Sequence, residues 1–316
     1  MMYQFRKAAG GMALALILSG TAAPAMLKAQ VTVPDASDGL WPLQPIAPDN
    51  NTLAPFMEGW YANPDGSFSF SFGYLNVNLD TLFIPLGENN SLDHPKFDGV
   101  QPTVFFPGRH RGVFSVTIPA NMEYESIWWD VTTEWGNNTR VPGRTGAVAY
   151  QLDWYPRPHG SVTPGVYFES ASNVGRGPPG IFDERTHTAS AGSPMTLSVN
   201  AMDPSERDQD DTRNVNVPLR VVWSQLQGPA SVAYSRHDSN PAPEMPTTGP
   251  ARFRRVPGPQ VISLSEGQGT ANVIVTFPEP GEYLMLAQVD NWAANDSGTQ
   301  DQCCWTNGYV RVTVTP

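Results

Sequence analysis

Two clusters of carboxylate and amide side chains are the residues of this sequence best suited to chemistry. Each follows a segment that is predicted to be a strand. The first contains Asp203, Asp208, Asp210 and Asp211, and the second contains Asp290, Asn291, Asn295, Asp296 and Asp301. Oxygen ligands of this kind suit calcium, which takes about six to eight of them. The spacing is not that of an EF-hand loop, so a calcium site requires a fold that brings the two clusters together.

Cys303 and Cys304 are adjacent and are the only cysteines in the sequence. In an oxidising compartment they have four alternatives: a disulfide with each other, two bonds to another chain, a pair of ligands for a soft metal, or free thiols. We rank the vicinal disulfide first, because no third cysteine exists to pair with either one. Such a ring would stiffen its loop and present Trp305 beside it.

Tryptophans offer a rival site. Trp128 and Trp129 are consecutive in a segment that resembles a strand, so their rings point to opposite faces of a sheet. An exposed ring there, together with Trp305, could stack on a sugar, which makes carbohydrate binding a second hypothesis. The alternative is that the proline-rich segments of the chain cover these rings.

Motifs of known catalytic types are absent from the sequence. The five histidines, His94, His110, His159, His187 and His237, are scattered singly, and neither His-Glu-x-x-His nor Gly-x-Ser-x-Gly occurs. A nucleophile needs a neighbouring base, and a metalloenzyme needs clustered ligands. We therefore expect no catalysis, unless residues gather from distant strands.

The first 29 residues have the features of an export signal. Arg6 and Lys7 precede the apolar run 12–18, and small residues mark cleavage after Ala25 or Ala29. No later segment approaches the length of about 18 apolar residues that a membrane helix needs. We expect a periplasmic or secreted protein, without a transmembrane segment.

Cleavage at the second site changes the charge balance. It removes three of the 19 basic residues, which leaves 16 against 30 acidic ones and a net charge of −14. Binding to nucleic acid requires a basic surface, so we expect no nucleic-acid partner.

The periodicity of apolar residues is two, which predicts strands. Alternation recurs in segments 68–72, 114–118, 197–201, 273–277 and 310–314, each typical of a strand with one wet face. In segment 68–72, the phenylalanines are then buried and the serines face water. With 28 glycines and 31 prolines in turns, the predicted fold class is all-β.

A proline- and glycine-rich stretch divides the predicted strands. It runs from residue 155 to residue 194 and suggests a boundary near residue 185. We expect a signal peptide at 1–29, an N-terminal β-sandwich with proline-rich flanks at 30–185, and a second β-sandwich at 186–316.

The second predicted domain resembles an immunoglobulin-like domain of the polycystic-kidney-disease (PKD) type. The resemblance begins near Thr188 and rests on four blocks in the order and spacing of that family. The blocks are MTLSVNAMDP (Met195–Pro204), LRVVWSQLQGP (Leu219–Pro229), ANVIVTFPEPGEYLMLAQVDN (Ala271–Asn291) and GYVRVTVTP (Gly308–Pro316). It implies that Trp223 is the buried tryptophan of strand C and that Tyr283 lies at the corner between strands E and F.

The same resemblance implies where the acidic clusters meet. In an immunoglobulin-like sandwich the B to C and F to G loops lie at one pole. The predicted calcium ligands Asp203, Asp208, Asp210, Asp211, Asp290, Asp296 and Asp301 would then converge there.

Residues Glu58–Asn78, EGWYANPDGSFSFSFGYLNVN, resemble a motif of a secreted bacterial family to which no activity is attached. Taken together, the sequence predicts an exported binding or adhesion protein of the cell envelope or exterior, without catalysis of its own. Its expected partner is an envelope protein or a glycan. The alternative is a carbohydrate-binding accessory or a component of a carbohydrate-active enzyme.

Overall fold

Strands dominate the protein, as the alternating segments predict. The structure is a computed structural model that describes residues 50–208, 210–211, 217–242, 257–294, 296–297 and 305–316. Within these ranges the helical pieces are two single 3-10 turns, η2 (Ala120–Met122) and η3 (Val148–Tyr150). The all-β fold class is confirmed. No helix in the described ranges is long and apolar enough to span a membrane.

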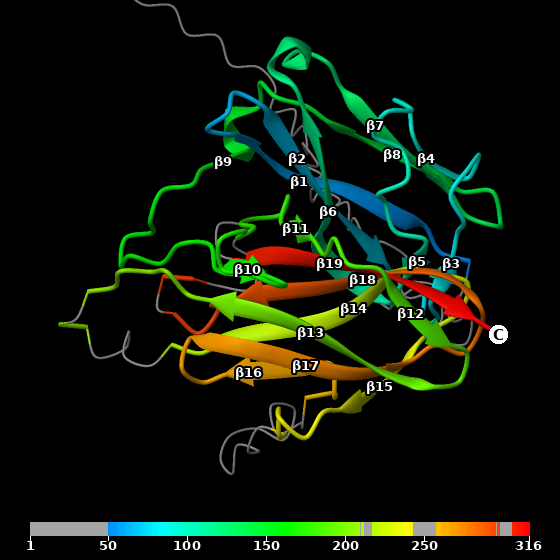
Figure 1. The fold of residues 1–316 in the computed structure, drawn as a ribbon. Coiled ribbons are helices and arrows are strands. Elements are labelled where there is room, and N and C mark those ends of the chain that lie inside the picture. The colour runs from blue at the N-terminus through cyan, green and yellow to red at the C-terminus, as the bar shows by residue number, and fades with distance from the viewer. Residues whose placement is uncertain (1–49, 209, 212–216, 243–256, 295, 298–304) are drawn as a thin grey trace, which may run out of the picture. The chain divides into compact units, whose positions relative to one another are not determined.

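The N-terminal part of the fold is built on a four-stranded sheet in the order β6-β2-β1-β9 (Figure 1). Its strands are β1 (Leu53–Ala62), β2 (Phe68–Asn76), β6 (Gly108–Ile118) and β9 (Gln151–Leu152). Strands β1 and β2 form a hairpin through the turn at 63–66, where Asn63 N donates to Ser67 O at 2.8 Å and Gly66 has a φ of 83°. Glycine tolerates this positive φ without steric cost.

The phenylalanine face of this sheet packs against a second, smaller sheet. That sheet has the order β4-β7-β8, with β4 (Asn90–Leu92), β7 (Ile127–Thr132) and β8 (Asn138–Gly143), while β3 (Leu82–Phe83) pairs with β5 (Val104–Phe105). Phe72 stacks on Phe114 at a centroid distance of 5.0 Å, and Trp129 meets Phe114 edge-on at 4.9 Å. Aromatic rings prefer these two geometries, so the predicted apolar side of β2 is the core of this part.

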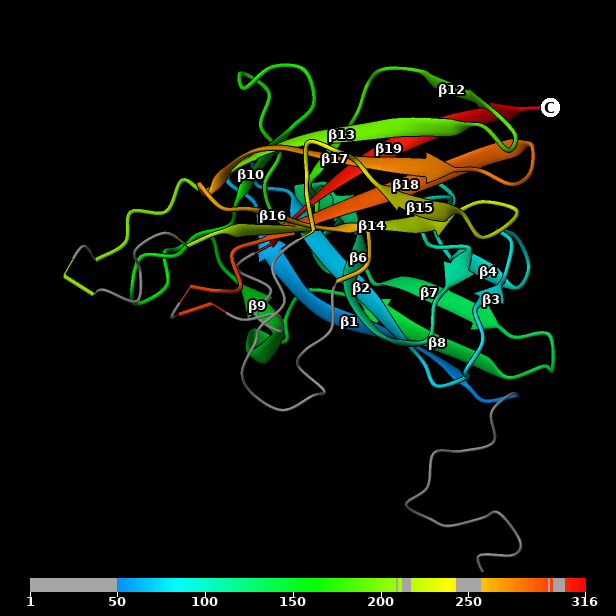
Figure 2. The same ribbon diagram turned by 90° about the horizontal axis from the view of Figure 1, so that it is seen from below.

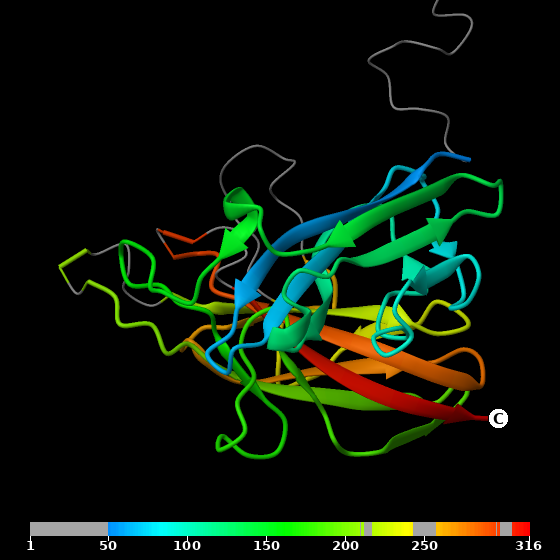
Figure 3. The same cartoon turned by 90° about the horizontal axis from the view of Figure 1, so that it is seen from above.

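The serine face of β2 is also covered, which corrects the prediction that it faces water. Ser69 and Ser71 are 1% and 0% exposed. Ser71 pairs with Ser115 of β6, and Val113 on the same side belongs to a core cluster with Leu286 of the C-terminal sandwich. Figure 3 shows β1 and β2 lying over β18 and β19. Alternation identified two faces correctly, but it could not reveal that a second layer covers the polar one.

The C-terminal part is a sandwich of two sheets (Figure 2). One sheet has the order β10-β13-β17-β15, from β10 (Gly165–Tyr167), β13 (Pro194–Met202), β17 (Gln268–Thr276) and β15 (Ala233–Arg236). The other has the order β11-β19-β18-β14-β16, and β12 also pairs with β19. Its strands are β11 (Ile181–Phe182), β12 (His187–Ser190), β14 (Leu219–Gln227), β16 (Val261–Leu264), β18 (Gly281–Asp290) and β19 (Trp305–Thr315).

Three features make this sandwich immunoglobulin-like. Trp223 on β14 is buried between the sheets at 1% exposure, as predicted. Tyr283 on β18 donates its hydroxyl to Glu279 O at 2.9 Å, which is the back-bond of a tyrosine corner. Strand β12 runs parallel to β19, while the other long strands pair antiparallel.

The two parts of the fold share contacts throughout. Residues Ile46–Pro316 form one compact unit. Strands β10 and β11 lie before residue 185 in the chain, yet they pair with β13 and β19 of the sandwich. The boundary near residue 185 stays a prediction, and the signal segment 1–29 lies outside the described residues.

Candidate functional site

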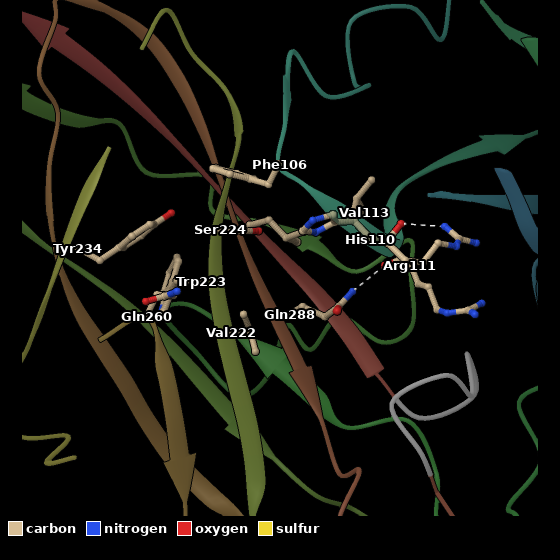
Figure 4. A pocket seen from close by; sticks show the side chains of 12 residues that line it. Phe106, His110, Arg111, Val113, Val222, Trp223, Ser224, Tyr234, Gln260 and Gln288 are labelled. Atoms are coloured by element: carbon tan, nitrogen blue, oxygen red, sulfur yellow. Dashed lines mark hydrogen bonds between the residues drawn. The ribbon is translucent and has the colours of Figure 1, made fainter. Parts of the chain in front are cut away.

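A cavity of about 560 Å³ lies where β6 approaches the outer face of β14 and β18 (Figure 4). Cavities of this size accommodate small ligands. It is lined by two guanidinium groups and an imidazole, and by aromatic, amide, hydroxyl and aliphatic side chains. These residues are Phe106, Arg109, His110, Arg111, Val113, Val222, Trp223, Ser224, Tyr234, Gln260, Leu286 and Gln288.

A bulge in β6 shapes one wall. Phe72 of β2 pairs with Phe114, but Tyr74 pairs with His110, so β2 advances by two residues while β6 advances by four. Gly112 within the bulge has a φ of 54°, and the Trp305 ring packs so closely on it that a Cβ atom would clash. Only glycine satisfies both conditions without strain. The bulge thereby redirects the side chains on either side of Gly112, as bulges do at functional sites.

The two arginines of β6 that line the cavity bind a buried carboxylate. Arg109 Nη2 lies 2.5 Å from Glu58 Oε1, and Arg111 Nη1 lies 3.3 Å from Glu58 Oε2. The Arg109 guanidinium also donates to Tyr74 O and His110 O and covers the Phe56 ring. In Figure 4 the Arg111 side chain and the His110 ring extend from β6 in different directions, the His110 ring toward the cavity. Arg109 and Arg111 thus both form ion pairs with the Glu58 carboxylate.

Burial governs the titration of both Glu58 and His110. Desolvation raises the pKa of Glu58, although Arg109 and Arg111 oppose it by favouring the carboxylate. Burial lowers the pKa of His110, and the neighbouring Arg109 charge lowers it further, against the hydrogen bond with Pro107 O. His110 is therefore neutral at pH 7. Because Pro107 O can only accept, Nε2 carries the proton across the 3.1 Å bond, which leaves Nδ1 as an acceptor.

The opposite wall comes from the sandwich and carries unpartnered donors. The indole Nε1 of Trp223 and the hydroxyl of Tyr234 are both buried without a hydrogen-bond partner. Burial also raises the pKa of Tyr234, so its hydroxyl stays protonated. In Figure 4 Tyr234 points toward the middle of the group, opposite His110. Most buried polar groups in proteins are paired, so these two atoms mark a place where a ligand could supply acceptors.

The predicted calcium ligands bond to protein groups where the structure describes them. Asp203 Oδ2 accepts from Arg207 at 2.6 Å, and Asp290 Oδ2 accepts from Arg220 at 2.6 Å. Asp296 accepts the backbone N–H groups of His159 and Ser161. Asp211 Oδ2 lies 3.7 Å from His159 Nδ1, and Asp208 Oδ1 accepts from Asp210 N. Asp301 lies outside the described residues.

Within the described part of the chain no group of three His, Cys, Asp or Glu side chains is placed to hold a metal. Calcium binding therefore stays a prediction. Cys303 and Cys304 lie outside the described residues, so their disulfide stays a prediction as well.

The three candidate tryptophans lie apart from the cavity's open side. Trp129 is 0% exposed and donates Nε1 to Asn90 Oδ1 at 3.0 Å. Trp305 is 2% exposed, packed on Gly112. Trp128 is half-buried, with the Arg140 guanidinium 4.2 Å above its ring. Neither Trp129 nor Trp305 offers a ring face to a solvent-borne sugar, and Arg140 occupies one face of Trp128.

Sequence reasoning did not single out the cavity. Nothing in the sequence distinguishes Tyr234 and Gln260 from their surroundings, His110 is one of five scattered histidines, and the pattern around Trp223 predicts only a core residue. The only local signal was the break in alternation at Arg109–Gly112, after which segment 114–118 resumes it. That break predicts a bulge but not what faces it.

Comparison with known proteins adds little. No protein-family model and no curated protein matches the sequence. Solved structures that match loosely include the D00-D0 domain of intimin, with 10% identity, 84% of this chain and 100% of that chain covered, and a TM-score of 0.25. Domains 4 and 5 of the S-layer protein SbsC share 12% identity, with 84% of this chain and 98% of that chain covered and a TM-score of 0.21. CfaE, the adhesive subunit of CFA/I fimbria of enterotoxigenic Escherichia coli, shares 10% identity, with 84% of this chain and 87% of that chain covered and a TM-score of 0.22. TM-scores this low say nothing about function. The assignment of an immunoglobulin-like sandwich rests on the strand topology of this chain.

Proposed function

We propose that this protein is an exported binding protein that holds its ligand in the cavity between β6 and the sandwich, without catalysis of its own. The observation that carries the proposal is the pair of buried donors, Trp223 Nε1 and the Tyr234 hydroxyl, left without partners on the cavity wall. A buried unpaired polar group costs about 1–3 kcal/mol. A ligand with acceptor atoms would remove that cost, and this gain would be available only to the bound state.

The contacts around the cavity favour binding over catalysis. No carboxylate is among the described residues that line it. The described hydrogen bond of the His110 ring goes to Pro107 O, and no described hydrogen bond joins this ring to Ser224. A serine nucleophile is activated by a base within hydrogen-bond reach, and the described contacts of Ser224 include none.

Export and domain type belong to the same proposal. The leader-like segment 1–29 supports a periplasmic or extracellular location, with an envelope protein or a glycan as the source of the ligand. The PKD-type assignment is supported by the Trp223-Ser224-Gln225 block on β14 and the Pro280-Gly281-Glu282-Tyr283 block that begins β18.

A cavity-blocking variant tests the proposal. Ser224→Phe places a ring in the cavity from β14, and Ser198→Phe is the matched control on β13, in the opposite sheet. A library of polar and apolar small molecules is screened by thermal shift, and hits are titrated by calorimetry. We expect hits on the wild type that Ser198→Phe retains and Ser224→Phe loses. Hits that bind all three proteins equally, or no hits at all, would contradict the proposal.

A further inference from the structure

We infer that this cavity binds a small organic monocarboxylate whose other polar atoms include hydrogen-bond acceptors. This inference rests on the proposed function and narrows it to one ligand class. It depends on three properties of the wall: an excess of positive charge, two buried donors without partners, and an apolar surface between them.

The positive charge of the wall exceeds the negative charge described beside it. The guanidinium groups of Arg109 and Arg111 line the cavity, and the single carboxylate described against them is that of Glu58. Because His110 is neutral, two positive charges against one negative charge leave a net charge of +1. Burial raises the pKa of Glu58, and any protonation of this carboxyl would only increase the excess. A net charge that is partly removed from water is costly, so an anion in the cavity would be stabilised.

A carboxylate fits this excess better than a phosphate does. Its single negative charge matches the excess, whereas a phosphate monoester carries about −1.5 to −2 at pH 7. The planar fork of an arginine also matches the two oxygens of a carboxylate. Arg111 is the better placed of the two arginines, because it lies 3.3 Å from Glu58 against 2.5 Å for Arg109, and its side chain is 32% exposed.

The charge of the whole chain opposes any anion, but it acts over longer distances. The sequence has a net charge of −11. At an ionic strength of about 0.15 M, charges are screened over about 8 Å. A bound carboxylate would contact the guanidinium directly, so the local excess governs affinity. The net charge of the chain mainly slows association.

The far side of the cavity offers donors to uncharged atoms of the ligand. Trp223 Nε1 can only donate, and the Tyr234 hydroxyl is buried without a partner. Figure 4 shows Tyr234 on the other side of the cavity from Arg111. A ligand that spans the cavity therefore needs a carboxylate at the arginine side and a carbonyl, ether or hydroxyl oxygen at the tyrosine side.

The surface between these two sides is apolar enough to pack against the ring or carbon chain of such an acid. Phe106 contributes an aromatic ring, and Val113, Val222 and Leu286 contribute aliphatic surface. The backbone N–H of Phe106 donates to the Tyr74 hydroxyl at 3.0 Å, so this wall is organised before binding. The volume of about 560 Å³ accommodates a small acid that carries a ring.

The test compares probes that differ mainly in charge. Wild-type protein is titrated by calorimetry with glucuronate, glucose and glucosamine, and with 4-hydroxybenzoate, 4-hydroxybenzamide and 4-hydroxybenzylamine. Glucose 6-phosphate is the dianionic comparison. We expect the acid of at least one set to bind at least tenfold more tightly than its uncharged counterpart, and the amine to bind most weakly. The set whose acid binds distinguishes a sugar acid from an aromatic acid. Raising the salt concentration from about 0.05 M to about 0.5 M should weaken binding of the acid and leave the uncharged probe unchanged.

Several outcomes would overturn the inference and leave the proposed binding function intact. They are equal or tighter binding of the uncharged probe, the amine or the phosphate, and an acid affinity that does not respond to salt. If no probe binds, the hits of the small-molecule screen that Ser224→Phe loses decide: acids among them support the inference, and their absence overturns it. An empty screen would remove the proposed function as well.

Two substitutions that change the charge in opposite directions separate a ligand contact from a structural role. Arg111→Gln lowers the net charge of the wall to zero, so affinity for the acid should fall about tenfold. Glu58→Gln raises it to +2, so affinity should rise. Arg140→Gln is the matched control, because Arg140 also pairs with a carboxylate, Asp130 at 3.1 Å, but does not line the cavity. A fall in both cavity variants, as a structural role predicts, or no change in either would overturn the inference. If Glu58→Gln does not fold, the salt dependence of the wild type still decides.

A conservative variant tests the acceptor side of the ligand. Tyr234→Phe removes only the unpartnered hydroxyl, so the melting temperature should stay or rise while affinity for the acid falls about tenfold. Tyr124→Phe is the control, because Tyr124 is 91% exposed and does not line the cavity. Unchanged affinity in Tyr234→Phe would overturn the assignment of ligand acceptors to this side.

Discussion

Strand β18 is buried on both faces, and the two faces differ in kind. Toward the sandwich core it presents Tyr283, Met285, Ala287 and Val289, packed among apolar side chains. Toward the N-terminal sheet it presents Leu284 and Leu286, followed by Gln288, whose amide donates to Arg111 O at 3.2 Å. The inner face is closed, whereas the outer face borders the cavity.

The two faces of β18 thus contribute differently: the inner face belongs to the apolar core that stabilises the fold, and the outer face borders the cavity. A close-packed apolar core stabilises the structure through buried area and tolerates little change in volume. The layer between β6 and the sandwich relies instead on directional hydrogen bonds from side chains such as Asn307, which fix one geometry and leave space beside them. The cavity therefore borders the layer held by directional hydrogen bonds, although two of its lining residues, Trp223 and Tyr234, also pack in the inner core.

Trp223→Ala should give the largest effect, because it empties the inner layer. We expect a loss of about 3–5 kcal/mol in unfolding free energy from cavity formation. Chemical denaturation with fluorescence detection measures it. Trp292→Ala is the control: Trp292 is 45% exposed, so its loss should cost less than about 1 kcal/mol. Similar losses in both variants would show that the inner layer is not the dominant source of stability.

Asn307→Ala should give the next largest effect, because it breaks the outer layer's hydrogen bonds. Asn307 is 0% exposed and donates to Gly112 O at 2.6 Å and to the Tyr309 hydroxyl at 2.9 Å. Leaving a buried carbonyl unpaired costs about 1–3 kcal/mol. Thr313→Ala, half-buried on the same strand, should change stability by less than about 0.5 kcal/mol. A negligible effect of Asn307→Ala would mean that the outer layer is held by its leucines alone.

His110 should give the smallest of the three effects and should show it only as a pH dependence. Because burial lowers its pKa below the ordinary 6.5, the unfolded chain takes up the proton first as pH falls. The stability that the neutral ring contributes is therefore complete above about pH 6.5 and is lost as pH drops through the lowered pKa.

Melting temperatures of the wild type and His110→Gln, recorded from about pH 7.5 to pH 5, test this dependence. Glutamine does not titrate, so the variant should lose less stability over that range. His237→Gln is the control, since His237 bonds only to the nearby Ser239 among its described partners. Parallel pH profiles for the wild type and His110→Gln would place the His110 ring outside the buried layer.

The sequence predicted the inner layer well because its information is local. Alternation in segments 197–201, 273–277 and 310–314 corresponds to β13, β17 and β19, and Trp223 and Tyr283 occupy the expected places. Each of these assignments needs only periodicity and a few residues of spacing.

The outer layer was missed because its contacts join distant parts of the chain. Asn307 reaches Gly112 across 195 residues, and Gln288 reaches Arg111 across 177. Nothing in segment 68–72 indicates that its serines are covered, since a polar residue facing water and one facing a second sheet have the same periodicity. The cavity forms where the N-terminal sheet packs on the C-terminal sandwich, so the sequence alone does not show that its lining residues lie together.

The position of β19 in the chain order sets when this molecule can complete its folding. Its residues Asn307 and Tyr309 bond to β6, and its backbone pairs with β11, β12 and β18. A chain that crosses a membrane from its N-terminus would deliver β1, β2 and β6 long before this strand. Until β19 arrives, one face of the early sheet would expose Val113 and Ser71 without their cover. Such late, long-range closure slows folding and prolongs the exposure of apolar surface. In an exported molecule of this design, that face would stay uncovered until β19 emerges.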